Sequence, residues 1–157
     1  GGGREGGGRP GTQDVRGAQA FAAAARACCD HLAERRMVVS ARAQRLYDEL
    51  CAPRTGIVPT TTATIDEGRL PGLVSVMVPS MDSETLVLKL DQLGFEVSAG
   101  SACSSGSLEA SHVLLAMGIA RVDALGSLRI SFDERADEEG LAAFAAALLG
   151  IVADARP

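Results

Sequence analysis

The sequence predicts an α+β domain, in which a long helix and a small mixed or antiparallel sheet are covered by further helices. Two observations predict this class. A region from about residue 14 to residue 50 is rich in Ala and Arg, which are good helix formers. After it, short Thr-, Val- and Ile-rich segments alternate with amphipathic ones. With 157 residues, 46% of them hydrophobic, the chain is large enough for one domain with a core.

The chain divides into three parts by composition. Residues 1–12 read GGGREGGGRPGT, which is either a flexible linker or a backbone nest for an anion, without the residues of a P-loop or a dinucleotide fingerprint. Residues 13–53 form the long helix, with a possible break near residues 37–40, and Pro53 and Gly56 end it. Residues 54–157 form the small α+β domain.

Within the small domain, the elements follow from periodicity and from capping residues. Asp82 or Ser83 begins a helix whose Leu86, Leu90 and Leu93 share one face, and Gly94 ends it. In the last strand, alternation places Arg129 and Ser131 on one face, opposite the apolar residues. We expect strands over residues 57–65, 73–78, 95–98 and 127–132, and helices over residues 84–93, 111–117 and 137–155.

Charge and composition exclude several functions. The net charge of −5 and the pI of about 5 argue against nucleic acid and against an anionic membrane surface. Aromatic residues make up 3% of the chain, and no apolar run is long enough to span a membrane. Since the chain begins with Gly, we expect a processed piece or a fragment.

One cysteine differs from the other three. Cys103 lies in a run of Gly, Ser and Ala between an apolar and a helical segment, which favours a loop with a reactive thiol over an idle loop cysteine. Cys28, Cys29 and Cys51 lie in the helical region, and no Cys-x-x-Cys pair or Cys/His cluster predicts a zinc site. We expect all four to be reduced, in a cytoplasmic protein.

Several segments, in the same order along the chain, resemble the C-terminal part of the cysteine desulfurases. These are class V aminotransferase-like enzymes that use pyridoxal 5′-phosphate (PLP). The cysteine loop and the glycine-rich segment are the specific parts of the resemblance. The matching segments are residues 1–12, the Arg-Leu-Pro at 69–71, and residues 98–105 (SAGSACSS), 108–118 (LEASHVLLAMG) and 127–132 (SLRISF).

The resemblance implies an activity and three site residues. Such an enzyme converts L-cysteine into L-alanine and leaves a persulfide on its own cysteine, here Cys103, for transfer to acceptors in iron–sulfur cluster synthesis or nucleotide thiolation. Arg129 would bind the substrate carboxylate, although without the resemblance a surface ion pair is the simpler interpretation. Thr12 would reach the PLP phosphate of the other subunit of a homodimer, or cap a helix, or do both.

The chain also departs from the family. Gly6, Ala110 and Asp133 replace a basic residue, a proline and a glycine that are usual there. PLP needs a lysine for its Schiff base. Lys89 is the only lysine, and it falls on the polar flank of a predicted helix with no histidine before it. The resemblance therefore implies that most of the PLP site lies outside this chain, which alone should be inactive.

Three other hypotheses about the function remain open. The chain can be a stand-alone sulfur-carrier or interaction module without PLP, which a histidine–lysine pair encoded upstream of Gly1 would contradict. It can be part of a selenocysteine lyase, which shares the fold. It can also be a structural domain whose cysteine is idle, in which case alkylation of Cys103 would have no effect.

Overall fold

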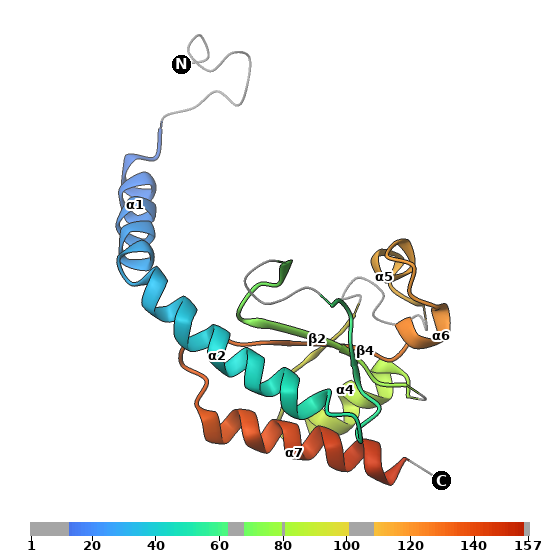
Figure 1. The fold of residues 1–157 in the computed structure, drawn as a ribbon. Helices are drawn as coiled ribbons and strands as arrows, with labels where there is room; N and C mark the ends of the chain where they lie inside the picture. Colours follow the sequence, from blue (N-terminus) through green and yellow to red (C-terminus); the bar gives the residue numbers. More distant parts are fainter. Residues whose placement is uncertain (1–12, 63–67, 80, 101–108, 156–157) are drawn as a thin grey trace. The chain divides into compact units, whose positions relative to one another are not determined.

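The structure is a computed structural model that describes residues 13–62, 68–79, 81–100 and 109–155 (Figure 1). The chain forms two compact units, residues 1–34 and residues 35–157. The elements in chain order are α1 (Val15–Asp30), α2 (Leu32–Leu50), β1 (Val58–Pro59), β2 (Leu73–Met77), α4 (Ser83–Gln92), β3 (Ser98–Ala99), α5 (His112–Ala116), α6 (Arg121–Ala124), β4 (Ser127–Ser131) and α7 (Glu138–Asp154).

The described part of the first unit is helical, and its helix begins at a capping aspartate. The Asp14 carboxylate accepts a hydrogen bond from the Gly17 backbone N–H at 2.9 Å, so Asp14 and not Thr12 caps α1. The predicted long helix is interrupted at His31, whose φ of −122° leaves the helical region, and not at residues 37–40. No residue of α1 is buried in the described structure.

The second unit is built on an antiparallel sheet, with the strand order β1-β2-β4-β3 among the described residues. The two central strands pair along their full length, from Leu73 opposite Ser131 to Met77 opposite Ser127. The outer strands are two residues each. The α+β class with a small antiparallel sheet is therefore confirmed.

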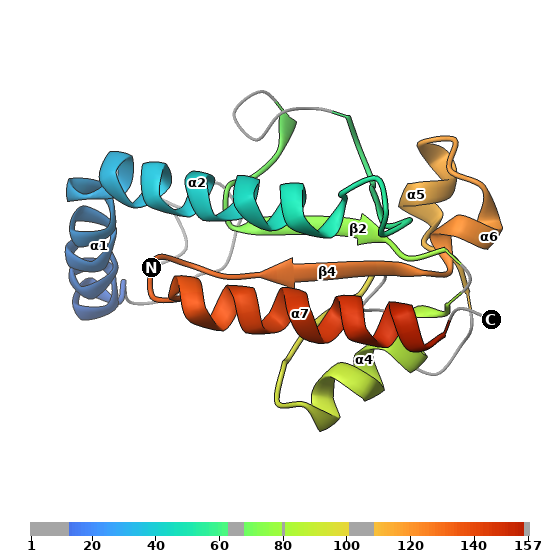
Figure 2. The same ribbon diagram turned by 60° about the horizontal axis from the view of Figure 1, so that its bottom comes forward.

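Three helices cover one face of this sheet. Figure 2 looks onto this face, with α2 and α7 in front of β2 and β4 and with α4 beside them. Leu86 and Leu90 of α4 are fully buried, as predicted, but Leu93 is 57% exposed because it lies at the C-cap, beyond the last turn that faces the sheet. The other large side chains with no exposed surface are Leu50, Val74, Val76, Val78, Leu128 and Leu148.

The helix ends follow the predicted capping signals. The Asp82 carboxylate accepts from the Thr85 backbone N–H at 2.8 Å and also from its hydroxyl, and these bonds hold the pKa of Asp82 below its usual value. Gly94 follows α4 with φ of +86°, a conformation that costs an L-residue free energy. These ends depend on neighbouring residues only, which is why the sequence predicts them.

The outer strands and one helix differ from the prediction. The strand expected over residues 57–65 is described only as β1, and the one expected over 95–98 begins at Ser98. The four-residue helix α6 was not predicted. It packs with α5 through a small separate cluster made by Ala110, Leu114 and Ala124. Two-residue strands depend on pairing with distant residues, and a helix of four residues is too short to show a periodic pattern in the sequence.

Candidate functional site

Arg129 projects from the sheet face opposite the three covering helices. Its neighbours Leu128 and Ile130 are buried in the core, so alternation along β4 places Arg129 on the other face, as predicted. The side chain is half-buried. Within the part of the chain that the structure describes, no hydrogen bond or ion pair joins the Arg129 side chain to another residue. The ion pair of an ordinary surface arginine is therefore not formed in this part.

Two serines flank Arg129 across the sheet. Ser75 of β2 and Ser98 of β3 both lie directly opposite Arg129, one on each side. Residues directly opposite in an antiparallel pair point to the same face. Their hydroxyls therefore share a face with the guanidinium. The three side chains form a polar row that sequence analysis missed, because only the register of three separate segments brings them together.

Cys103 lies within residues 101–108, outside the described residues, but the residues before them are well placed. The Gly100 N–H donates to the Ser127 carbonyl at 3.1 Å. A Cβ at Gly100 would meet Ser127 Oγ at 1.9 Å, so only glycine fits there. Gly100, just before the segment that carries Cys103, is thus bonded to the first residue of β4 and lies two residues after Ser98, the strand partner of Arg129.

The residues after that segment lie close to the same place. Ala110 is buried against Leu114 and Ala124. Leu114 Cδ1 is also the third-nearest atom to a Cβ built on Gly100, at 3.7 Å. Both described flanks of residues 101–108 therefore meet at Leu114, beside the start of β4.

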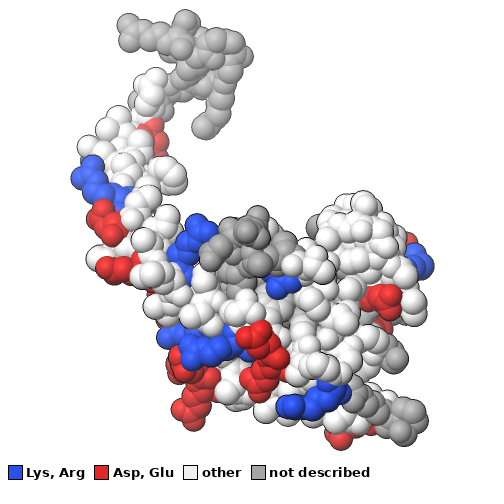
Figure 3. Space-filling model, in the orientation of Figure 1, with Lys and Arg blue, Asp and Glu red and all other residues white. Residues whose placement is uncertain are grey.

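The α5–α6 lobe beyond these flanks has an apolar surface. Val113, Met117 and Val122 are each more than half exposed. Figure 3 shows the lobe at the right as mostly uncharged, whereas charged side chains gather over the lower part of the molecule.

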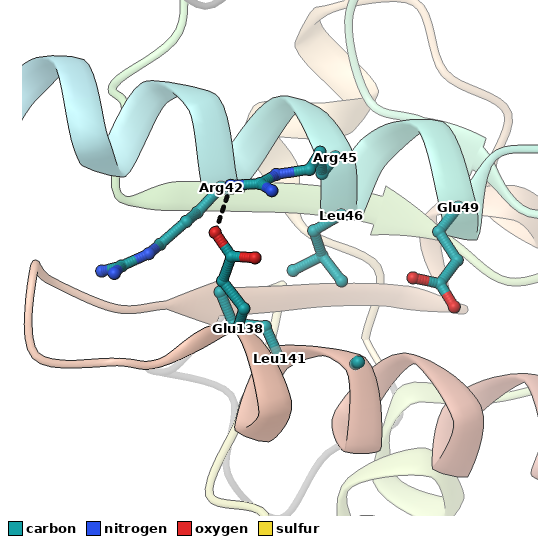
Figure 4. A pocket seen from close by; sticks show the side chains of 7 residues that line it. Arg42, Arg45, Leu46, Glu49, Glu138 and Leu141 are labelled. Carbon is teal, nitrogen blue, oxygen red and sulfur yellow. Dashed lines mark hydrogen bonds and ion pairs between the residues drawn. The ribbon is translucent and has the colours of Figure 1, made fainter.

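The charged groove between α2 and α7 is a separate feature (Figure 4). Arg45 pairs with Glu138 at 2.6 Å, and Arg42 donates to the Glu134 carbonyl at 2.8 Å. Both helices lie on the covered face of the sheet, away from Arg129. The Arg45–Glu138 pair joins α2 to α7, and the Arg42 bond joins α2 to the turn before α7.

The three described cysteines are free thiols in different settings. Cys28 and Cys29 are exposed on α1, and Cys51 is half-buried at the end of α2. Burial raises the pKa of the Cys51 thiol, an effect that the nearby Arg69 guanidinium partly opposes and Asp48 reinforces. The described residues contain no group of three or more His, Cys, Asp or Glu side chains placed to hold a metal ion.

We expect Cys51 to react slowly with iodoacetamide at pH 8, because a raised thiol pKa leaves less thiolate at that pH. Its alkylation rate should increase with pH over a higher range than the rate of a free cysteine, whose pKa is about 8.5. Peptide mass spectrometry over a pH series measures these rates. If Cys51 reacts as fast as free cysteine at pH 8, its half-buried environment does not control its reactivity.

Among the described residues, no lysine is placed to supply the amine that PLP requires for its Schiff base. Lys89 is exposed in the last turn of α4, as predicted. That helix packs on the face of the sheet opposite Arg129, so its amine is separated from Arg129 by the core. Thr12, the other predicted cofactor contact, lies outside the described residues. We therefore derive no chemical step through the cofactor from this chain.

Comparison with known proteins agrees with this fold. A cysteine desulfurase from Gluconacetobacter diazotrophicus is 35% identical over 99% of this chain and 38% of its own length. An IscS-like cysteine desulfurase from Mycobacterium tuberculosis is 37% identical over 99% of this chain and 39% of its own length. A solved NifS-like protein superposes with a TM-score of 0.76 at 30% identity, covering 98% of this chain and 38% of that one.

The sequence also matches the aminotransferase class-V family over residues 7–144. The chain therefore belongs to the aminotransferase class-V family. It spans about two fifths of the length of the curated cysteine desulfurases that it matches. No described helix is both long and apolar enough to cross a membrane.

Proposed function

We propose that this chain is the persulfide-carrying, C-terminal part of a cysteine desulfurase that acts on L-cysteine with PLP. In this proposal Arg129 binds the substrate carboxylate and Cys103 accepts the sulfur. The observation that carries it is the half-buried Arg129 on the sheet face opposite the helices, with no side-chain partner among the described residues. A guanidinium in such a place is suited to a planar anion.

The position of the Cys103 segment supports the same proposal. The residue paired with Arg129 on β3 is Ser98, and Cys103 follows it by five positions in the sequence. The Cys103 segment therefore follows β3, the strand that pairs with the one carrying the proposed carboxylate-binding group. A substrate with a carboxylate at one end and a sulfur at the other matches that pair of groups.

Bonds, electrons and protons balance in the proposed sulfur transfer. The Cys103 thiolate attacks the sulfur of L-cysteine and forms a sulfur–sulfur bond, while the carbon–sulfur bond of the substrate breaks. The electron pair of the broken bond stays on carbon, which takes a proton and becomes the methyl group of L-alanine. The persulfide then passes its outer sulfur to the thiol of an acceptor protein.

One observation favours the alternative of a sulfur carrier without PLP activity. Lys89 lies on the side of the sheet opposite Arg129, where it cannot serve the same site. The two functions differ in their products. The protein in its full length, supplied with PLP and L-cysteine, should produce L-alanine together with protein-bound sulfane sulfur. A carrier would accept sulfur from a persulfide donor and produce no L-alanine from L-cysteine.

We expect Thr12 to act on the cofactor of the other subunit in a homodimer. Residues 1–12 contain seven glycines and little that could form a core, so we propose that a partner subunit orders them. Heterodimers that combine a Thr12→Ala subunit with a subunit lacking the PLP lysine should place both defects in one site and leave the other site active. Half of the wild-type activity is the expected result, and activity that follows each chain's own residues would contradict it.

A further inference from the structure

Ser75 is the closer of the two serines that flank Arg129. The Val78 N–H donates to the Gly126 carbonyl at 2.9 Å, and hydrogen-bonded pairs recur at every second residue of an antiparallel ladder. Ser75 lies three positions before Val78, so its pair with Arg129 is of the non-hydrogen-bonded kind. In such pairs the Cα atoms are about 4.5 Å apart and the side chains approach most closely.

The opposite flank of Arg129 is wider. The bond from Gly100 to Ser127 makes these two residues a hydrogen-bonded pair. Because such pairs recur at every second residue, Ser98 and Arg129 are a hydrogen-bonded pair as well. Hydrogen-bonded pairs have Cα atoms about 5.5 Å apart. Of the two serines, Ser75 is therefore the one placed to act together with the guanidinium.

The backbone of Ser75 is held on its outer side by groups that are not part of a regular ladder. Its N–H donates to the Tyr47 hydroxyl at 2.9 Å, and its carbonyl accepts from the Thr60 N–H at 3.1 Å. Because β1 ends at Pro59, Tyr47 supplies the partner that an adjacent strand would otherwise provide. Both backbone groups of Ser75 are thereby satisfied, which fixes the position of its side chain relative to β4.

Tyr47 is itself held in place. It is only 5% exposed, and the Arg69 guanidinium carbon lies 4.2 Å from the centre of its ring. Arg69 also donates to the Thr61 carbonyl. The contacts therefore form a continuous series from Arg69 through Tyr47 and Ser75 to Arg129.

We propose that Ser75 is a second carboxylate-binding residue, whose hydroxyl donates to the carboxylate that Arg129 binds, and that Tyr47 is its positioning residue. This inference rests on the proposed function. A carboxylate has about four lone-pair sites, and a guanidinium fork occupies two of them. The Ser75 hydroxyl has no hydrogen-bond partner among the described residues, so it is available for a third. Three donors from two rigid strands fix the orientation of the carboxylate as well as its place.

The test uses the protein in its full length with PLP, and the variants Ser75→Ala and Tyr47→Phe. Two probes separate the carboxylate from the sulfur: L-alanine has the carboxylate and no sulfur, and cysteamine has the sulfur and no carboxylate. We expect Ser75→Ala to raise the KM for L-cysteine and the Kd for L-alanine by about five- to tenfold. The kcat and the affinity for cysteamine should not change. Tyr47→Phe keeps the ring over which Arg69 stacks, and it should give a smaller increase in KM with the same kcat.

Ser131→Ala is the matched control, because Ser131 is on the same face of β4 but exposed at its end, opposite Leu73. It should have wild-type constants, and thermal melting of all three variants should show a folded protein. If the wild-type protein converts L-cysteine and Ser75→Ala has the same KM and Kd, the inference is overturned while the proposed function stands. An equal loss of affinity for L-alanine and cysteamine also overturns it. If the wild-type protein neither converts L-cysteine nor binds L-alanine, the proposed function fails and this inference fails with it.

Discussion

Replacing Cys103 with serine in the full-length protein should abolish formation of the protein-bound persulfide and of L-alanine from L-cysteine. A serine hydroxyl does not become an anion at neutral pH, and an alkoxide does not replace a thiolate in attack on sulfur. A free cysteine has a pKa of about 8.5, so the site must favour the thiolate. The Arg129 guanidinium supplies a positive charge on β4, the strand paired with β3, which precedes the Cys103 segment. Substrate and cofactor binding should survive, because neither needs the thiol.

The measurement is to incubate the protein with ³⁵S-labelled L-cysteine and to locate the sulfane sulfur by peptide mass. The variants Cys28→Ser, Cys29→Ser and Cys51→Ser are the matched controls. They should retain the activity, since Cys28 and Cys29 are on α1, outside the unit that contains Arg129, and Cys51 packs against the core at the end of α2. Label on one of those three cysteines, or full activity in Cys103→Ser, would show that the nucleophile has been assigned wrongly.

Arg129→Ala should have the second-largest effect, a loss of affinity for L-cysteine. Removing a charge-assisted hydrogen bond to a carboxylate costs about 1.5–3 kcal/mol, which corresponds to a decrease in kcat/KM of roughly ten- to hundredfold. Arg129→Lys keeps the charge but not the planar fork, so it should recover only part of the affinity. Steady-state kinetics with L-cysteine and equilibrium binding of L-alanine measure both effects.

Arg135→Ala controls for the loss of a nearby positive charge. Arg135 is 85% exposed just beyond β4 and is paired with Asp133 at 2.5 Å, so it is close in sequence but occupied elsewhere. We expect its variant to bind L-alanine like the wild type. Should Arg129→Ala also bind L-alanine with wild-type affinity, Arg129 is not the carboxylate-binding residue.

Helices whose ends carry local signals were predicted well. α4 has its cap at Asp82 and its terminating glycine at Gly94, and the amphipathic α7 begins after Asp137, all as expected. Each of these signals acts over three or four residues, so the sequence alone contains it. Where no such signal existed, the prediction was less accurate, as in the interruption at His31 and the single turn of α6.

Strand boundaries depended on partners far away in the chain. The alternation in residues 127–132 was enough to assign Arg129 to the face opposite Leu128 and Ile130, because burial on one face imposes a period of two. The lengths of β1 and β3 were not predictable in the same way. A segment is a strand only where another segment pairs with it, and here those partners are β2 and β4.

The sequence by itself determined the class of fold, the face on which Arg129 lies and the single cysteine set among small residues, because composition, periodicity and capping are local properties. Only the tertiary structure decided what surrounds Arg129. Ser75 and Ser98 become its neighbours through the register of three strands, and Tyr47 reaches Ser75 because α2 packs beside β2. It also placed Lys89 on the opposite side of the core. Contacts of this kind join residues tens of positions apart, and the packing of the whole domain, not any local pattern, selects them.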